Sequence, residues 1–187
     1  MDITELILAD HDRQRRGFAL LDEARGAGVE VGIVEAIWAG LAILLEAHAD
    51  AEEKLFYPRL LGVGTEATDE TEDAISDHND IRDGVRAAAA QEAGSRGWWS
   101  SVADTRTANS DHMGEEERGA LADFRRHAPL GLRQQVGLEF AAYEASRSDG
   151  IDRSDGIDRS DGIDRSDGID RSNKDPDAYV EQHRRSG

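Results

Sequence analysis

The chain has 187 residues, a formal net charge of −18 at pH 7 and no cysteine. Its length suits one hydrophobic core rather than two, and its negative charge disfavours a nucleic-acid partner because phosphates would be repelled. The absence of cysteine excludes thiolate catalysis, iron–sulfur ligation and disulfide bonds.

The sequence gives no sign of export or of a membrane span. The first residues lack the basic and apolar regions of a signal peptide. The longest apolar-rich run, residues 31–45, is interrupted by Glu35 and is too short to cross a bilayer. We therefore expect a soluble cytoplasmic protein with neither a nucleic-acid nor a membrane partner.

The first two helices are predicted over about residues 2–25 and 30–56. Glycines follow the first helix, and Pro58 disfavours helix in the residue that precedes it. In the second helix an apolar stripe at steps of three and four residues continues through His48 and Glu52. An ionised carboxylate on a buried face is costly unless it is paired or binds a metal, so this stripe indicates a polar site in the core.

Two more long helices follow. The third is predicted to begin near Thr68 and to carry His78 on its inner face. The fourth follows the glycine-containing break at residues 94–97 and carries His112 and Glu116. Four long amphipathic helices with short turns predict an all-α fold, an up-down-up-down four-helix bundle.

The C-terminal region is predicted to have two parts. A fifth helix over about residues 132–146 could cover one side of the bundle. From Ser148 the hexad Ser-Asp-Gly-Ile-Asp-Arg is repeated four times, through Arg171. One apolar residue in six cannot offset the ordering entropy, so this region is predicted to be a disordered tail that the bundle does not need. The predicted organisation is a bundle over residues 1–128, a helix over 129–147 and a tail over 148–187. Binding of a protein partner through the tail stays open.

Four of the six histidines belong to a pattern that occurs twice. In each half, one helix carries a His and the next carries His-x-x-x-Glu, and residues four apart share one face of a helix. The six residues are His11, His48, Glu52, His78, His112 and Glu116. Six inward ligands are more than one ion needs and suit two. Carboxylates that can bridge would be surplus for zinc and suit iron, or manganese. His127 and His183 fall outside the pattern and are interpreted as ordinary packed or solvated histidines.

In order and spacing these motifs resemble those of hemerythrin-like proteins, also called HHE cation-binding proteins, over about residues 1–128. The resemblance rests on Asp10-His11-Asp-Arg, His48-Ala-Asp-Ala-Glu52-Glu-Lys-Leu-Phe-Tyr-Pro58, Asp77-His78-Asn-Asp-Ile-Arg and His112-Met-Gly-Glu-Glu116-Glu. It implies a four-helix bundle around a non-haem di-iron centre, whose two iron ions share an oxo or hydroxo bridge. By this resemblance His11 and His48 would bind one iron, and His78 and His112 the other. Glu52 and Glu116 would bridge the two ions.

The sequence departs from the oxygen-carrying members, which have a fifth histidine one turn away on the third helix. The positions four before and four after His78 are Ala74 and Arg82. Both irons could then accept an exogenous group. This favours reaction with hydrogen peroxide, O2 or NO, in an oxidative or nitrosative stress response, over reversible O2 carriage. A weak catalase- or peroxidase-like activity, an O2 or NO sensor, and an iron-binding or storage protein without turnover all remain open.

The residues beside the ligands are ambiguous. Tyr57 lies nine residues after His48, about 180° away in a regular helix, so it is predicted to be a packing residue. It could become an additional ligand if the helix unwinds ahead of Pro58. The spacing predicts that three further glutamates face solvent, namely Glu53, Glu115 and Glu117.

Overall fold

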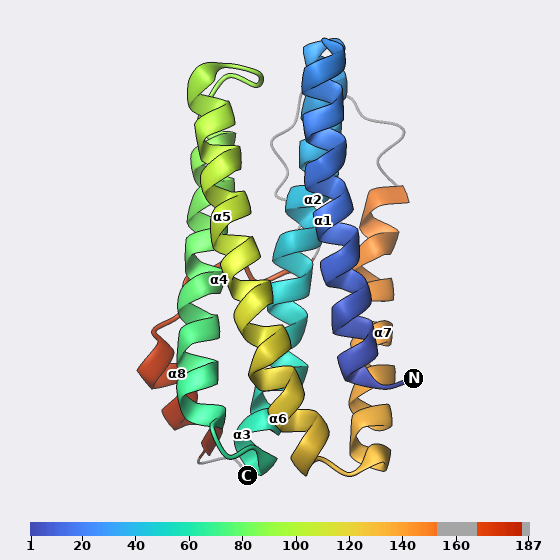
Figure 1. Cartoon of the computed structure of the whole chain (residues 1–187), viewed down its shortest axis with the longest axis vertical. Coiled ribbons are helices and arrows are strands. Elements are labelled where there is room, and N and C mark those ends of the chain that lie inside the picture. The colour runs from blue at the N-terminus through green and yellow to red at the C-terminus, as the bar shows by residue number, and fades with distance from the viewer. Residues whose placement is uncertain (153–167, 185–187) are drawn as a thin grey trace.

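The computed structural model describes residues 1–152 and 168–184, and in these ranges the chain is helical and has no strand. The helices are α1 (Ile3–Ala27), α2 (Val31–Ala51), the π-helix η1 (Glu52–Phe56), α3 (Tyr57–Val63), α4 (Ala67–Ala89), α5 (Arg96–Arg118), α6 (Ala120–His127), α7 (Leu130–Asp152) and α8 (Pro176–Arg184). The four long helices α1, α2, α4 and α5 lie side by side along the long axis (Figure 1). The all-α prediction is confirmed as a helical bundle.

Local signals in the sequence account for several helix ends. The Asp2 side chain accepts a hydrogen bond from Thr4 N at 3.0 Å and so caps the start of α1. Gly28 ends α1 in the left-handed conformation, with φ of 64°, which costs glycine least. Ser95 caps the start of α5 by accepting from the backbone N–H of Trp98.

The second long helix differs from its predicted course. It does not stop at Phe56, because the backbone widens into the π-turn η1 and then continues as α3. The N–H of Tyr57 donates to the carbonyl of Glu52, five residues back. Pro58 falls in the first turn of α3 and has no N–H, so it cannot donate the helical hydrogen bond that another residue would make there.

Two apolar clusters lie at the two ends of the bundle. One contains side chains from the start of α1, from α3 and from α6, such as Ile7, Leu60 and Phe124. The other contains the rest of α1, the first half of α2 and the start of α5, such as Leu21, Trp38 and Trp98. Along α1, α2, α4 and α5 the buried polar residues come between the members of these two clusters. The fold therefore encloses a polar layer between two hydrophobic cores.

The C-terminal region packs against this bundle. α7 contacts α1 and α2, and its Val136 and Phe140 are fully buried. The prediction of a disordered tail is wrong for residues 168–184, because α8 packs against α3 and α4 and buries Tyr179 and Val180. Tyr179 and Val180 lie beyond the repeat, so the hexads' low apolar content did not apply to them. Residues 153–167, which hold most of the repeat, lie outside the described residues.

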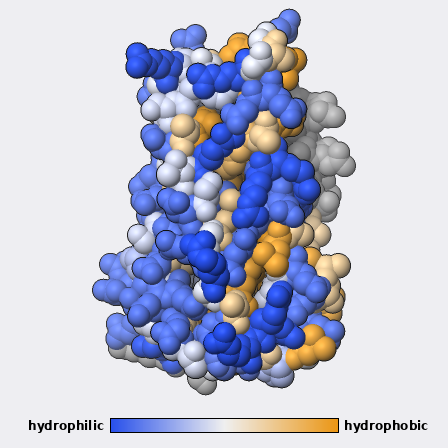
Figure 2. Space-filling model, viewed as in Figure 1, coloured by the Kyte–Doolittle hydropathy of each residue, from blue (hydrophilic) through white to orange (hydrophobic). Residues whose placement is uncertain are grey.

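In the described part of the chain, one helical stretch, Val31–Val63, is long and apolar enough to cross a membrane, with a mean hydropathy of 1.6. Length and composition alone are weak evidence, because the core helix of a soluble protein passes the same test. In this structure the stretch lies in the core of the bundle and buries His48, Asp50, Glu52 and Glu53 against the other helices. The face drawn in Figure 2 is mostly hydrophilic, with hydrophobic residues confined to patches.

Candidate metal centre

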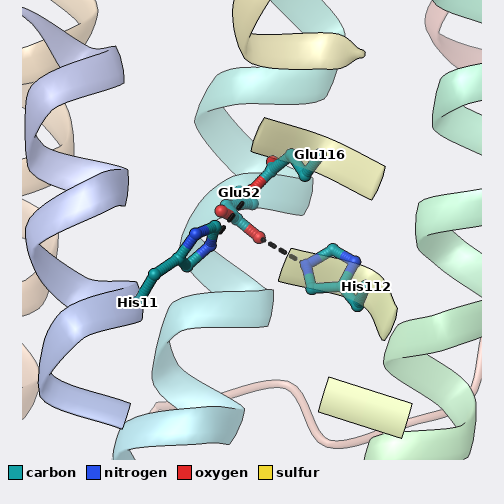
Figure 3. A group of neighbouring side chains, drawn as sticks. All are labelled: His11, Glu52, His112 and Glu116. Atoms are coloured by element: carbon teal, nitrogen blue, oxygen red, sulfur yellow. Dashed lines mark ion pairs between the residues drawn. The ribbon is translucent and has the colours of Figure 1, made fainter. Parts of the chain in front are cut away.

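The six residues of the repeated pattern meet in the polar layer. His11 comes from α1, His48 from α2 and Glu52 from the start of η1. His78 comes from α4, and His112 and Glu116 from α5. All six are buried, with at most 4% of the surface of each exposed. Figure 3 shows four of these side chains, from three of the helices, pointing toward one another.

Glu52 lies at the middle of the group. Its Oε1 is 2.9 Å from His48 Nε2, and its Oε2 is 3.2 Å from His78 Nε2. His112 Nε2 is 3.7 Å from the same Oε2. The two carboxylate oxygens thus face histidines on opposite sides, which is the arrangement that a bridging carboxylate requires.

Glu116 has a different environment. Its Oε2 is 3.2 Å from His11 Nε2, but its Oε1 accepts a hydrogen bond of 2.8 Å from the Tyr57 hydroxyl. One oxygen of Glu116 therefore faces the histidines, while Tyr57 fixes the other.

The histidines form two pairs. The ring centroids of His11 and His48 are 5.2 Å apart, and those of His78 and His112 are 4.5 Å apart. Within the second pair the two Nε2 atoms are 3.2 Å apart. The family resemblance would assign each of these pairs to one of two ions.

The donor set fits a metal. Several buried atoms that face the middle of the group have no hydrogen-bond partner among the described residues: His11 Nε2, His48 Nε2, Glu116 Oε2 and both oxygens of Glu52. Leaving such atoms unsatisfied is costly in a dry core, and a cation would satisfy all of them. Moreover His11, Glu52, His112 and Glu116 bring ligand atoms within 4.8 Å of one another. Imidazole and carboxylate together suit a first-row transition metal.

In the metal-free site the short distances between histidines and carboxylates shift their pKa values. Burial by itself would lower the pKa of His112, but the carboxylates of Asp77, Glu52 and Glu116 raise it to about 10. The pKa of His48 is also raised, because Glu52 and Asp10 outweigh burial. In turn, the neighbouring histidines hold the pKa of Glu52 well below its usual value despite burial. Metal binding would therefore displace protons from His48 and His112.

A second carboxylate supports each histidine from outside. These four outer carboxylates are Asp10, Glu53, Asp77 and Glu117. They lie beside Nδ1 of His48, His78, His112 and His11, at 3.4, 2.9, 3.6 and 2.9 Å in that order. A carboxylate on Nδ1 fixes the ring orientation, leaves Nε2 for the metal and strengthens the histidine as a ligand.

Sequence reasoning missed this outer ring, although the repeated pattern contained a signal for it. Each half of the chain has an acidic residue just before its first histidine, Asp10 or Asp77, and another just after its ligand glutamate, Glu53 or Glu117. The prediction that Glu53 faces solvent is wrong, since it is only 2% exposed and Arg82 donates to both of its oxygens at 2.9 Å. Its pKa is lowered to about 2, because His78 and the nearby cations outweigh burial.

The two other ambiguous glutamates lie at the edge of the group. Glu117 is partly exposed and pairs with Arg15 at 2.6 Å as well as with His11. Glu115 is exposed, as predicted. His127 contacts Asp123, and His183 packs on Tyr179, so both lie away from the group as predicted.

The prediction that Tyr57 packs away from the site is wrong, and the π-turn is the reason. A π-turn acts as one extra residue in an α-helix, so it rotates the residues after it by about 100°. This change carries the Tyr57 side chain round toward the face of His48 and Glu52. Burial, together with the charges of Glu116 and Glu52, raises the Tyr57 pKa well above 10, so the hydroxyl keeps its proton in the metal-free site.

A cavity of about 60 Å³ adjoins the group between α4 and α5. Tyr57, His112 and Glu116 form its inner wall, and Ala74 and the acidic Glu70 also line it. Ala74 is the position one turn before His78, so its small side chain leaves this space open. Arg82, one turn after His78, instead points to Glu53.

Comparison with known proteins agrees with this geometry. No curated protein and no solved structure matches the chain. A family model described as the hemerythrin HHE cation binding domain matches residues 2–123, which include all six residues of the group. The chain therefore belongs to the hemerythrin HHE cation-binding domain family.

Proposed function

We propose that this chain is a non-haem di-iron protein that binds and reacts with a small oxidant: hydrogen peroxide, O2 or NO. The observation that carries the proposal is the placing of four histidine Nε2 atoms around two buried carboxylates, with a carboxylate beside every Nδ1. Iron, when bound, would supply exchangeable coordination positions and one-electron redox changes.

Each protein residue has a role in this proposal. The histidines hold two ions in the pairs His11 with His48 and His78 with His112. Glu52 would be a ligand shared by the two ions, because its two oxygens face different histidines. Glu116 is the second carboxylate ligand. Tyr57 is a hydrogen-bond donor that orients Glu116 rather than a ligand, because its hydroxyl lies 2.8 Å from Glu116 Oε1.

The cavity supports a small reactant. Its volume of about 60 Å³ has room for a few water-sized groups and excludes larger substrates. Ala74 keeps the cavity open next to His112 and Glu116, where a larger side chain would fill it. The residues thus leave an approach to the centre for a diatomic molecule or a peroxide.

We also propose that the protein is cytoplasmic and that its four long helices run up-down-up-down. The bundle order is supported by the short connections between the long helices, at residues 28–30, 64–66 and 90–95. The hydrophilic face in Figure 2 supports an aqueous environment around the protein.

Metal analysis of variants tests the site. Purified protein should contain two irons per chain, and His48→Ala and His112→Ala should each lower that number. His127→Ala, which changes a histidine outside the group, is the matched control and should keep both ions. If His48→Ala and His112→Ala both retain two irons, the site assignment is wrong.

Rapid mixing tests the reaction. The protein is reduced without air and mixed with O2, with NO or with hydrogen peroxide while its absorption spectrum is recorded. We expect rapid oxidation by O2 and modest decomposition of peroxide in an oxygen-electrode assay. Uptake of O2 that vacuum reverses completely, without any peroxide consumption, would instead assign the protein to carriage or sensing.

A further inference from the structure

The outer ring of carboxylates has one marked asymmetry. Glu53 and Glu117 hold equivalent places in the two halves, each beside a histidine Nδ1 at 2.9 Å. The Glu117 side chain is 28% exposed, and the Arg15 that it pairs with is 44% exposed. By contrast, the Glu53 side chain is 1% exposed and meets two cations, Arg82 at 2.9 Å and Lys174 at 2.6 Å. The histidines behind these two carboxylates are therefore supported in different ways.

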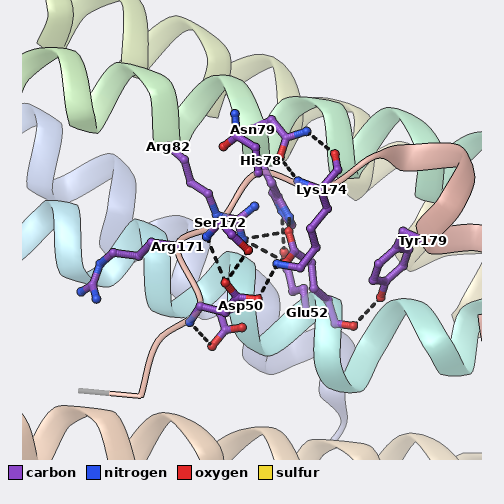
Figure 4. Close-up of polar contacts among 12 residues, drawn as sticks. Asp50, Glu52, His78, Asn79, Arg82, Arg171, Ser172, Lys174 and Tyr179 are labelled. Carbon is purple, nitrogen blue, oxygen red and sulfur yellow. Dashed lines mark hydrogen bonds and ion pairs between the residues drawn. The ribbon is translucent and has the colours of Figure 1, made fainter. Parts of the chain in front are cut away.

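Lys174 comes from the C-terminal segment of residues 168–184, which we name the clamp segment. It crosses α2 and α4 on the outside of the bundle (Figure 4). The backbone of Lys174 is held from both sides by Asn79, which accepts from its N–H at 2.9 Å and donates to its carbonyl at 2.7 Å. Asn79 follows His78 directly in α4.

Further contacts hold the clamp segment on either side of Lys174. The N–H of Asp170 donates to the buried Asp50 at 3.1 Å, and the side chain of Ile169 is buried. The Tyr179 hydroxyl donates to the backbone carbonyl of Glu53. The clamp segment is thus held at Asp170, at Lys174 itself and at Tyr179, so the Lys174 side chain extends to Glu53 from a fixed backbone.

The sequence of the clamp segment changes at this contact. Residues 168–172 continue the repeat, but Asn173 and Lys174 stand where the four preceding copies have Asp and Gly. Asn173 donates to Asp83 at 3.2 Å, where an aspartate would be repelled. A glycine at position 174 would remove one of the two cations from Glu53. These two replacements supply the contacts that the clamp segment makes with Asp83 and Glu53.

We propose that Lys174 is a positioning residue for the metal centre, which acts on His78 through Glu53 and makes the two metal positions inequivalent. The proposal rests on the proposed function, since it needs a redox metal on His78. A carboxylate on Nδ1 makes a histidine a stronger donor, and cations on that carboxylate reduce this effect. The ion held by His78 therefore has the higher reduction potential of the two.

The test is Lys174→Met, which keeps the length of the side chain and removes its charge. We expect the reduction potential of one iron to fall, with the other iron unchanged, when potentials are measured by spectroelectrochemistry. Iron release to a chelator should become slower, because His78, made a stronger donor, holds its ion more tightly. Lys174→Arg keeps the cation, so its reduction potential and its rate of iron release should equal those of the wild type.

Lys54→Met is the matched control, because Lys54 pairs with Asp50 at 2.7 Å and makes no contact with Glu53. Its effect on the potential should be several times smaller, since this charge is partly exposed, is paired with Asp50 and is screened by solvent. Equal shifts in Lys174→Met and Lys54→Met, or no shift in either, would overturn the positioning role. Wild-type protein without two irons would instead overturn the proposed function, so the two failures are distinguishable.

Amide hydrogen exchange in the metal-free protein gives a readout that needs no metal. Residues 168–184 should be protected in wild type and less protected in Lys174→Met, because the ion pair with Glu53 helps to hold the clamp segment. Full exchange of these amides in the wild type, as fast as in an unfolded peptide, would also overturn the proposal.

Discussion

The hydrogen bond from Tyr57 to Glu116 can be tested by removing one atom. Tyr57→Phe deletes the hydroxyl and leaves Glu116 Oε1 without its 2.8 Å donor in a fully buried setting. Hydrogen bonds to charged groups contribute about 1.5–3 kcal/mol, and a buried acceptor left alone costs a similar amount. We expect metal-free Tyr57→Phe to lose about 2 kcal/mol of unfolding free energy, or roughly 4–8 °C in Tm for a chain of this size.

The assay is thermal unfolding followed by circular dichroism, with and without bound iron. Iron should reduce the loss, because the metal would then neutralise Glu116, and iron content should be unchanged. The matched control is Tyr143→Phe, whose hydroxyl donates to Asp50, because Asp50 keeps Lys54 and the N–H of Asp170 as partners. That control should lose less than about 1 kcal/mol. Equal losses in the two metal-free variants would refute the reasoning, and loss of iron from Tyr57→Phe would show that the centre needs the hydroxyl, as a ligand or through Glu116.

Three further outcomes are expected. Ala74→His places an imidazole in the cavity beside the centre, so it should slow oxidation by air and suppress peroxide decomposition, measured by stopped-flow absorption and the oxygen electrode. Burial and the charges of Asp123, Glu66 and Glu116 raise the pKa of Glu70 from 4.5 to about 7. Between these values the folded protein keeps a proton that the unfolded chain has lost, so stability falls as pH rises through this range. Because Glu70 is partly exposed, metal-free Glu70→Gln should exceed wild type by at most about 1 kcal/mol at pH 8 and match it at pH 4, by urea unfolding. Gly84→Ala would bring a Cβ within 3.2 Å of the Thr105 Cα, between α4 and α5, and should cost about 1–2 kcal/mol in the same assay. Gly40→Ala meets nothing within 4 Å and should gain about 0.5–1 kcal/mol. A stabilised Gly84→Ala would contradict the close packing of the two helices.

The sequence by itself indicated the four long helices and the six residues that meet in the polar layer. Helical periodicity is local, so steps of three and four residues were enough to place His48 and Glu52 on the same buried face as the leucines before them. The repetition of the pattern in His78, His112 and Glu116 indicated a shared site without any knowledge of how the helices pack. The family follows from the same motifs.

Only the tertiary structure decided the features that depend on contacts between elements. Tyr57 faces Glu116 because a π-turn shifts the helical register. The residues at Glu52–Phe56 form no pattern from which that turn could have been predicted. Glu53 is buried because Arg82 from α4 and Lys174 from the clamp segment neutralise it. Spacing along the chain could not reveal these partners, which lie 29 and 121 residues away. A charged side chain can be buried where its partners converge, and that convergence is a property of the packed fold.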